Sequence, residues 1–281
     1  MRSIREIQQR TIAYFEQYSV PNAKLDTDLL MAHCLGVKRL DLYLDLERPL
    51  TDLQLDVLRP LVKRRALREP LQHIIGSLEF AGVTLSVDKR ALIPRQETEE
   101  LFMYACEHAR DRPQTILDLG TGSGALAIAL AKKYPQAQVT AVDVSPDALS
   151  LAQENSSANA SEKTVQFIRS NWYDSLPMDE KYDLIISNPP YLAKGEMTSA
   201  APEVINYEPR IALQSGEEGL DDLQIIIAGA HDRLTTGGLL ALEAGIAHNE
   251  ALMQIAKTAR LEGTCIEDLS GRPRFFLATK C

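Results

Sequence analysis

Long apolar runs are missing from this chain of 281 residues. No run approaches the roughly 20 consecutive apolar residues that a membrane-spanning helix needs. The first ten residues, MRSIREIQQR, are charged and amphipathic, and they lack the apolar centre of a signal peptide. We therefore expect a cytoplasmic protein that has no membrane partner.

Cysteine and histidine are also scarce, with four and five residues respectively. The cysteines show no CxxC spacing, and no two histidines stand at the spacing of a metal site. Scattered cysteines of this kind are typical of reduced thiols rather than of a disulfide framework. We expect no structural disulfide and no metal.

Positive charge is in short supply, since the net charge is −9. The first 76 residues are nearly balanced, so most of the negative charge lies in the remainder. Non-specific binding to nucleic acid depends on neutralising phosphates, and we expect no direct nucleic-acid binding. One basic cluster stands out, and it is either a solvated helix face or a partner-binding surface: Lys63, Arg64, Arg65 and Arg68.

The hydrophobic period changes along the chain and divides it into three parts. Residues 1–75 carry apolar groups at helical intervals and predict a small helical bundle, with one helix interrupted at Pro60. Residues 76–92 alternate around Ala81 and Gly82, which indicates a β-hairpin linker. In residues 93–281 short apolar strands alternate with helices, which predicts a doubly wound α/β sheet whose last two strands pair antiparallel.

A glycine-rich turn, LDLGTGSGALAIAL, follows the first strand of that sheet and opens a helix. Glycines let a backbone approach a ligand closely, and a helix N-terminus offers free N–H groups. The turn is not a phosphate-binding P-loop, because Ala125 and Leu126 stand where Gly and Lys are needed. Asp143 ends the next strand, where a ribose-binding carboxylate belongs. The turn alone fits NAD and S-adenosylmethionine equally well.

A second stretch, DLIISNPPYL, places an Asn, two prolines and a Tyr directly after a buried strand. The prolines end the strand stiffly, at the sheet edge where open α/β folds bind ligands. The side-chain carbonyl of Asn188 and the backbone carbonyl of Pro189 are two acceptors that suit one NH2 group. Tyr191 is expected to stack on the planar group behind it. Methylation of nitrogen needs this arrangement, whereas hydride transfer does not.

These stretches together resemble the class I S-adenosylmethionine-dependent methyltransferases, and more narrowly the HemK/PrmC family. The resemblance runs over nearly the whole chain, and further segments carry it: PLQHIIGSLEFAG, LIPRQETEEL, AVDVSPDAL, YEPRIAL and DLSGRPRF. It implies a Rossmann-like, seven-stranded sheet behind an N-terminal helical substrate-recognition domain. It also implies methyl transfer from S-adenosylmethionine, with S-adenosylhomocysteine as product. The acceptor would be the glutamine amide in the Gly-Gly-Gln motif of peptide-chain release factors, so that the reaction modulates translation termination.

The resemblance also implies site residues. Those at the reacting centre are Asn188, Pro189, Pro190 and Tyr191, with Arg95 and Glu97 as further substrate contacts. Those at the cofactor are Gly120, Thr121, Gly122, Ser123, Gly124, Asp143, Asn171, Trp172 and Asn188. Asn171 stands where the family commonly has an acidic residue. The long segment 192–220 is expected to place Tyr207, Glu208 and Pro209 over the substrate.

Three alternatives remain open beside this reading. An Asn-Pro-Pro-Tyr corner also occurs in enzymes that methylate an exocyclic amine of a nucleic-acid base. A sister family methylates a ribosomal-protein glutamine, but it typically has PRSPIAEL where this chain has PRQETEEL. A non-catalytic binding protein is the third alternative. We expect a monomer that acts on release factors.

Overall fold

The computed structural model describes residues 2–109, 112–161 and 164–281, and the chain divides into two compact units. The first unit joins Met1–Gly76 with Ala201–Tyr207, and the second joins Ser77–Ala200 with Glu208–Cys281. The chain therefore leaves the second unit after Ala200 and returns to it at Glu208. The methyltransferase domain was predicted as residues 93–281, but residues 201–207 of that range belong to the first unit.

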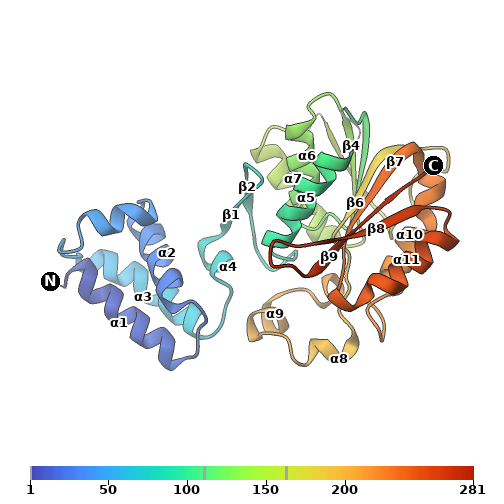
Figure 1. Ribbon diagram of the computed structural model, residues 1–281. Coiled ribbons are helices and arrows are strands. Elements are labelled where there is room, and N and C mark those ends of the chain that lie inside the picture. The colour runs from blue at the N-terminus through green and yellow to red at the C-terminus, as the bar shows by residue number, and fades with distance from the viewer. Residues whose placement is uncertain (1, 110–111, 162–163) are drawn as a thin grey trace. The chain divides into compact units, whose positions relative to one another are not determined.

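The first unit is helical, and its helices follow the apolar periodicity of the sequence (Figure 1). Ser3 and Thr51 begin two of the helices, and each accepts a backbone N–H in a capping box. Leucine and isoleucine from all the longer helices share one core with Phe15. The helical elements are α1 (Ile4–Gln17), α2 (Ala23–Leu35), η1 (Arg39–Leu44), α3 (Asp52–Ala66), α4 (Leu71–Ile75) and α9 (Pro202–Tyr207).

The predicted interruption at Pro60 is wrong, because α3 continues through it. Proline removes only one intrahelical hydrogen bond, and Pro60 lies on the exposed side of α3. Leu55 and Leu58 on the other side of the helix are buried in the core. Packing of that apolar face therefore outweighs the local cost of the proline.

Part of the basic cluster is not a solvated face, because it holds the segment 201–207 to the helical unit. Arg65 is 5% exposed, and it donates to Asp26 at 2.7 Å and to Glu203 at 2.9 Å. Arg68 donates to both carboxylate oxygens of Glu203, at 2.7 Å each. The Tyr207 hydroxyl donates to the Leu67 carbonyl at 3.1 Å.

The second unit opens with the predicted hairpin and continues as a seven-stranded sheet in the order β5-β4-β3-β6-β7-β9-β8. Only β9 runs against its neighbours, so the antiparallel pairing expected for the last two strands is confirmed. The strands are β1 (Ser77–Phe80), β2 (Val83–Ser86), β3 (Thr115–Leu119), β4 (Gln138–Asp143), β5 (Val165–Arg169), β6 (Tyr182–Ser187), β7 (Leu234–Glu243), β8 (Glu262–Glu267) and β9 (Pro273–Thr279).

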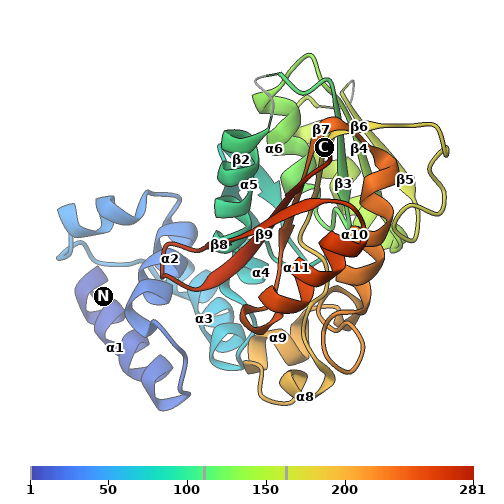
Figure 2. The same cartoon turned by 45° about the vertical axis from the view of Figure 1, so that its right-hand side comes forward.

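Helices cover both faces of this sheet, as Figure 1 shows, and α10 and α11 lie side by side in Figure 2. Along β3, Ile116 packs beneath α5 and α6, whereas Leu117 and Leu119 pack beneath α10 and α11. Burial on both faces explains why these strands are apolar runs without alternation. The helices are α5 (Gln96–His108), α6 (Ala125–Lys133), α7 (Pro146–Ala158), α8 (Lys194–Met197), α10 (Asp221–Arg233) and α11 (Asn249–Thr258), with short turns η2 (Arg210–Ala212) and η3 (Ile246–His248).

The sheet has a switch point at β3. The chain passes outward from β3 to β4 and β5, and then crosses to the other side of β3 as β6. Leu119 pairs with both Val142 and Ser187, so β3, β4 and β6 end at the same sheet edge. Ligands of open α/β sheets bind in the crevice that forms at such a point.

The described residues contain neither a membrane-spanning helix nor a cluster of metal ligands. No helix among them is long and apolar enough to cross a membrane. Within the same residues, no group of three or more His, Cys, Asp or Glu side chains could hold a metal ion.

The buried ion pairs of Arg65 make a stability prediction for the helical unit. Arg65→Met leaves the Asp26 carboxylate buried without its partner, so we expect the unit to lose about 3 kcal/mol of unfolding free energy. Arg59→Met is the matched control on the same helix, because Arg59 pairs with Asp56 at the surface, and it is expected to change stability by less than about 1 kcal/mol. Hydrogen exchange of the α1–α3 amides measures both, and equal losses would contradict this account.

Candidate active site

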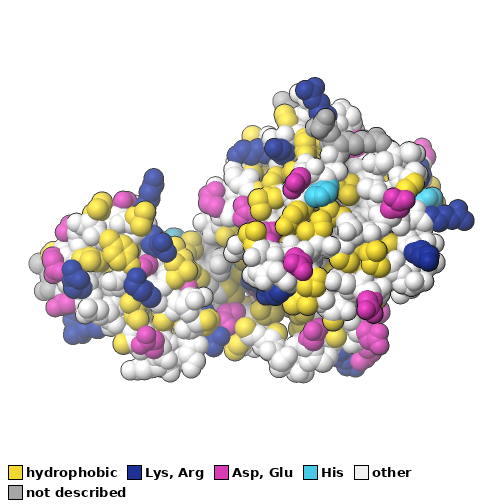
Figure 3. Space-filling model, viewed as in Figure 1, with side chains coloured by type: hydrophobic (Ala, Val, Ile, Leu, Met, Phe, Trp, Pro, Cys, Tyr) yellow, Lys and Arg dark blue, Asp and Glu magenta, His cyan; other side chains and the backbone are white. Residues whose placement is uncertain are grey.

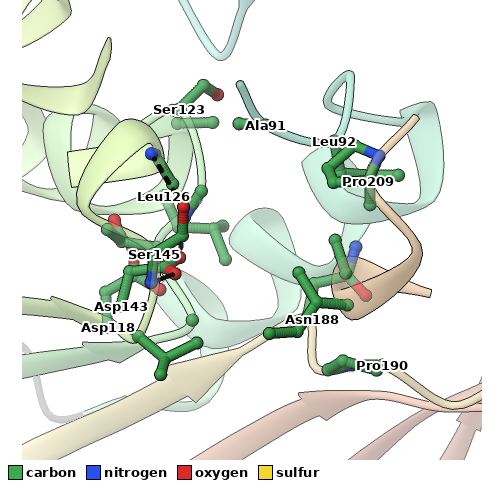
Figure 4. Close-up of a pocket in the computed structure, with 18 of the residues that line it drawn as sticks. Ala91, Leu92, Asp118, Ser123, Leu126, Asp143, Ser145, Asn188, Pro190 and Pro209 are labelled. Atoms are coloured by element: carbon green, nitrogen blue, oxygen red, sulfur yellow. Dashed lines mark hydrogen bonds between the residues drawn. The ribbon is translucent and has the colours of Figure 1, made fainter. Parts of the chain in front are cut away.

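A cavity of about 260 Å³ lies in the second unit at the switch point of the sheet. The glycine-rich turn after β3 forms one side of it, and the start of the Asn-Pro-Pro-Tyr corner after β6 forms the other. Figure 4 shows Asp118 and Asp143 on one side of this cavity and Asn188 and Pro190 on the opposite side. The two stretches that the sequence singled out therefore face the same space.

Glycine is required at the turn for two separate reasons. Gly120, Gly122 and Gly124 all have positive φ, a region that side chains with a Cβ rarely occupy. A Cβ on Gly124 would also stand 2.9 Å from Ile128 Cδ1 and 3.3 Å from the Ala152 backbone. The turn therefore brings its backbone close to both the neighbouring helix and the cavity.

Asp143 holds the glycine-rich turn in place at the end of β4. One of its carboxylate oxygens accepts the Gly122 N–H and the other accepts the Ser145 N–H, both at 2.9 Å. A carboxylate has further lone pairs, so these bonds leave Asp143 able to accept from a ligand in the cavity. Burial raises its pKa, while the backbone N–H groups act in the opposite direction.

Asp118 is a cavity residue that the sequence analysis missed. Its Oδ2 accepts from the Thr121 hydroxyl at 2.6 Å and from the Ala127 N–H at 3.2 Å. Its Oδ1 is buried and has no hydrogen-bond partner among the described residues. Burial raises the pKa of Asp118 to about 7. A carboxylate within the apolar strand TILDL was the available signal, because a charge is rarely buried there without a purpose.

Trp172 and Asn171, which were predicted to lie at the cofactor, line the cavity. The Trp172 indole donates to Asp222 at 3.0 Å, and its ring is the group that a Cβ on Gly120 would meet at 3.3 Å. Trp172 has a positive φ, which is unusual for a bulky side chain. Asn171 is exposed and donates to Asp174 at 3.2 Å.

Asn188 lines the cavity, and the NH2 group of its side chain is hydrogen-bonded within the protein. Its Nδ2 donates to the Thr98 hydroxyl at 2.9 Å, and the Thr98 hydroxyl donates to Glu243 at 2.8 Å. None of the described residues donates to Asn188 Oδ1. Pro190 also lines the cavity, whereas Pro189 is buried and Tyr191 is not among the lining residues.

Tyr191 occupies a different place from the one expected for a stacking platform. Its hydroxyl donates to Glu243 at 2.9 Å and accepts from Arg274 at 3.1 Å. The Arg274 guanidinium lies 5.2 Å from the centre of its ring. Burial raises the pKa of Tyr191, so the ring is a neutral support behind the corner.

Arg95 and Glu97, predicted as substrate contacts, do not line the cavity. Arg95 donates to both carboxylate oxygens of Glu208, at 2.6 and 2.7 Å, and Arg272 donates to Glu97 at 3.3 Å. Among the three residues expected over the substrate, Tyr207 belongs to the helical unit and only Pro209 lines the cavity. Sequence spacing could not show which members of the segment 192–220 turn inward.

Comparison with known proteins places the chain in a family. The family described as "Methyltransferase small domain" matches residues 98–220, and "PrmC N-terminal domain" matches residues 6–76. A release factor glutamine methyltransferase of Geobacter sulfurreducens is 40% identical over 89% of this chain and 87% of its own. The chain belongs to the family of release factor glutamine methyltransferases. The relative of that name from Deinococcus radiodurans is 38% identical and covers 99% of this chain and 98% of its own.

Solved structures agree on the fold of the second unit. A methyltransferase from Pyrococcus furiosus has a TM-score of 0.54 and 19% identity, covering 71% of this chain and 89% of its own. The predicted class I methyltransferase fold and the resemblance to the HemK/PrmC family are thus confirmed.

The geometry at Gly124 predicts a loss of stability on adding a methyl group. Gly124→Ala places a Cβ against Ile128 at a positive φ, so we expect a loss of about 2 kcal/mol. Gly195→Ala is the control, because no atom lies within 4 Å of its added Cβ and its φ is ordinary. Urea unfolding followed by Trp172 fluorescence measures both variants, and a Gly124→Ala protein as stable as the control would contradict the geometry.

Proposed function

We propose that this protein transfers a methyl group from S-adenosylmethionine to a glutamine side-chain amide of peptide-chain release factors, in their Gly-Gly-Gln motif. The observation that carries the proposal is the orientation of Asn188. Its NH2 is committed to Thr98, so its carbonyl oxygen is the group left for a ligand in the cavity. A carbonyl oxygen accepts a hydrogen bond from the NH2 of a glutamine amide.

The opposite side of the cavity fits the proposed methyl donor. The unpartnered Oδ1 of Asp118 suits the donor's ammonium group, and Asp143 suits its ribose hydroxyls. The positive-φ glycines let the turn lie close to its methionine end, and Trp172 with Asn171 would flank its adenine. When bound, S-adenosylmethionine supplies a methyl group activated by a positive sulfonium.

The remaining chemistry is mostly positioning. An amide nitrogen is a weak nucleophile, because its electron pair is delocalised into the carbonyl. Asn188 Oδ1 and the Pro189 carbonyl would hold the two N–H bonds and favour positive charge on that nitrogen. The nitrogen electron pair would accept the methyl group that bound S-adenosylmethionine supplies, its sulfonium would keep the electrons of the broken bond, and one amide proton would leave to water. Holding the reactants in line can supply about 7–11 kcal/mol in favourable cases.

The proposed setting of the reaction follows from its substrate. A release factor is a protein of the translation machinery, which favours the cytoplasm as the place of action. The net charge of −9 disfavours non-specific nucleic-acid binding. Action as a monomer stays a prediction.

Labelled S-adenosylmethionine tests the proposed function. We expect wild-type protein to label an intact release factor, but neither its Gly-Gly-Gln glutamine variant nor total RNA. Asn188→Ala is expected to remove most of the label while the protein still binds the donor. Label on RNA and none on the release factor would show that the corner holds a base amine instead.

The raised pKa of Asp118 predicts that donor affinity depends on pH. Below about 7 the free protein carries Asp118 protonated, and a bound ammonium favours the charged carboxylate. Binding then releases a proton, so affinity should rise about tenfold from pH 6 to pH 8. Trp172 fluorescence titration measures it, and Asp118→Asn should be nearly independent of pH. A wild-type affinity that falls with rising pH over this range would contradict the assignment.

The helical unit is proposed to recognise the release factor away from the chemistry, since one glutamine offers little surface. Leu40 and Leu44 are 70% and 84% exposed in η1, and apolar side chains are visible on this unit in Figure 3. Exposed apolar groups of this kind often mark a protein contact.

Changing both leucines to serine is expected to raise KM for the intact release factor about tenfold, because each lost apolar contact weakens binding. KM for a short Gly-Gly-Gln peptide should stay unchanged. Met178→Ser in the second unit removes a side chain of similar exposure, 81%, and serves as the control. Steady-state kinetics with both substrates measures the two KM values. An equal rise of KM for the release factor and the peptide would show that Leu40 and Leu44 do not form the recognition surface.

A further inference from the structure

A buried polar network lies behind Asn188, and it joins segments that are far apart in the chain. Its members are Thr98 in α5, Asn188 and Tyr191 in the corner after β6, Glu243 at the end of β7 and Arg274 in β9. The Glu243 side chain is 1% exposed and stands at the centre, where one oxygen accepts from Thr98 and the other accepts from Tyr191. Arg274 Nη2 lies 4.0 Å from the carboxylate.

The direction of every hydrogen bond in the network follows from Glu243. Both oxygens of Glu243 accept, one from Thr98 and the other from Tyr191, so the single proton of the Thr98 hydroxyl is committed to Glu243. The Thr98 oxygen is then left with lone pairs for Asn188, and only the NH2 of Asn188 can bond to it. Turning the Asn188 amide over would set its carbonyl against those lone pairs and break the 2.9 Å bond. Thr98 therefore selects one of the two orientations of the amide.

We propose that Thr98, held by Glu243, is a positioning residue that fixes Asn188 with its carbonyl toward the substrate amide. In the opposite orientation Asn188 would present N–H groups to the N–H groups of the substrate. The proposal rests on the proposed function, since it assigns the acceptor role to Asn188 Oδ1.

Thr98→Val tests the proposal, because valine keeps the shape of threonine and removes the hydroxyl. We expect kcat on the release factor to fall about tenfold or more, since Asn188 loses the bond that orients it. The Kd of S-adenosylmethionine, read from Trp172 fluorescence, and KM for the release factor should change by less than about threefold. Thr98→Ser keeps the hydroxyl, and it is expected to restore most of the kcat.

A matched control separates positioning from folding. Thr235 also donates its hydroxyl to a carboxylate, Asp183 at 3.0 Å, but it does not line the cavity. Thr235→Val should lose a similar amount of thermal stability and keep its kcat. A Thr98→Val enzyme that keeps its kcat, or one that loses donor binding together with kcat, would overturn the proposal. Failure of wild-type enzyme to label the glutamine would instead overturn the proposed function.

Discussion

The buried carboxylate of Glu243 is the constraint on which the rest of the active site depends. A charge in this position must have its hydrogen bonds made, because an unpaired buried carboxylate is costly. Thr98 and Tyr191 supply donors, and Arg274 supplies a nearby positive charge. Burial raises the pKa of Glu243, and these partners act against that shift by favouring the ionised form. The carboxylate thereby ties α5, β7, β9 and the corner after β6 together behind one amide.

The ends of two neighbouring strands form the two sides of the cavity. β3 ends in the glycine-rich turn and β6 ends in the Asn-Pro-Pro-Tyr corner, and their register aligns the two ends. Stiff prolines restrict one stretch, and the hydrogen bonds from Gly122 and Ser145 to Asp143 hold the other. A donor and an acceptor amide held between them need little further rearrangement, which suits a reaction that depends on alignment.

Sequence patterns predicted much of the fold because burial on both faces marks the central strands clearly. The helix that the glycine-rich turn was predicted to open is α6, which begins directly after Gly124. β7 begins at Leu234, but its first half contains Gly237 and Gly238 and lacks the apolar pattern by which a strand is recognised from sequence. The segment 201–207 groups with the helical unit through Glu203, and an ion pair between residues so distant in the chain leaves no local signal.

Site residues that stand in a continuous motif could be predicted from the sequence. Site residues that only the packing of distant segments brings together could not. Asn188, Asp143 and two of the glycines, Gly120 and Gly122, stand in recognisable stretches and line one cavity, whereas Gly124 is not among its lining residues. Thr98, Asp118 and Glu243 were missed, although Asp118 interrupts one apolar strand and Glu243 ends another. Arg95 and Glu97 were predicted as substrate contacts from their stretch alone, but their side chains form ion pairs and do not line the cavity.

The measurement that tests this account most directly is a crystal structure of the protein with S-adenosylhomocysteine and a Gly-Gly-Gln peptide. The account predicts that the glutamine nitrogen lies about 3 Å from both Asn188 Oδ1 and the Pro189 carbonyl, with Asn188 Nδ2 still bonded to Thr98. A glutamine bound with its carbonyl oxygen toward Asn188, or bound outside the cavity, would contradict it.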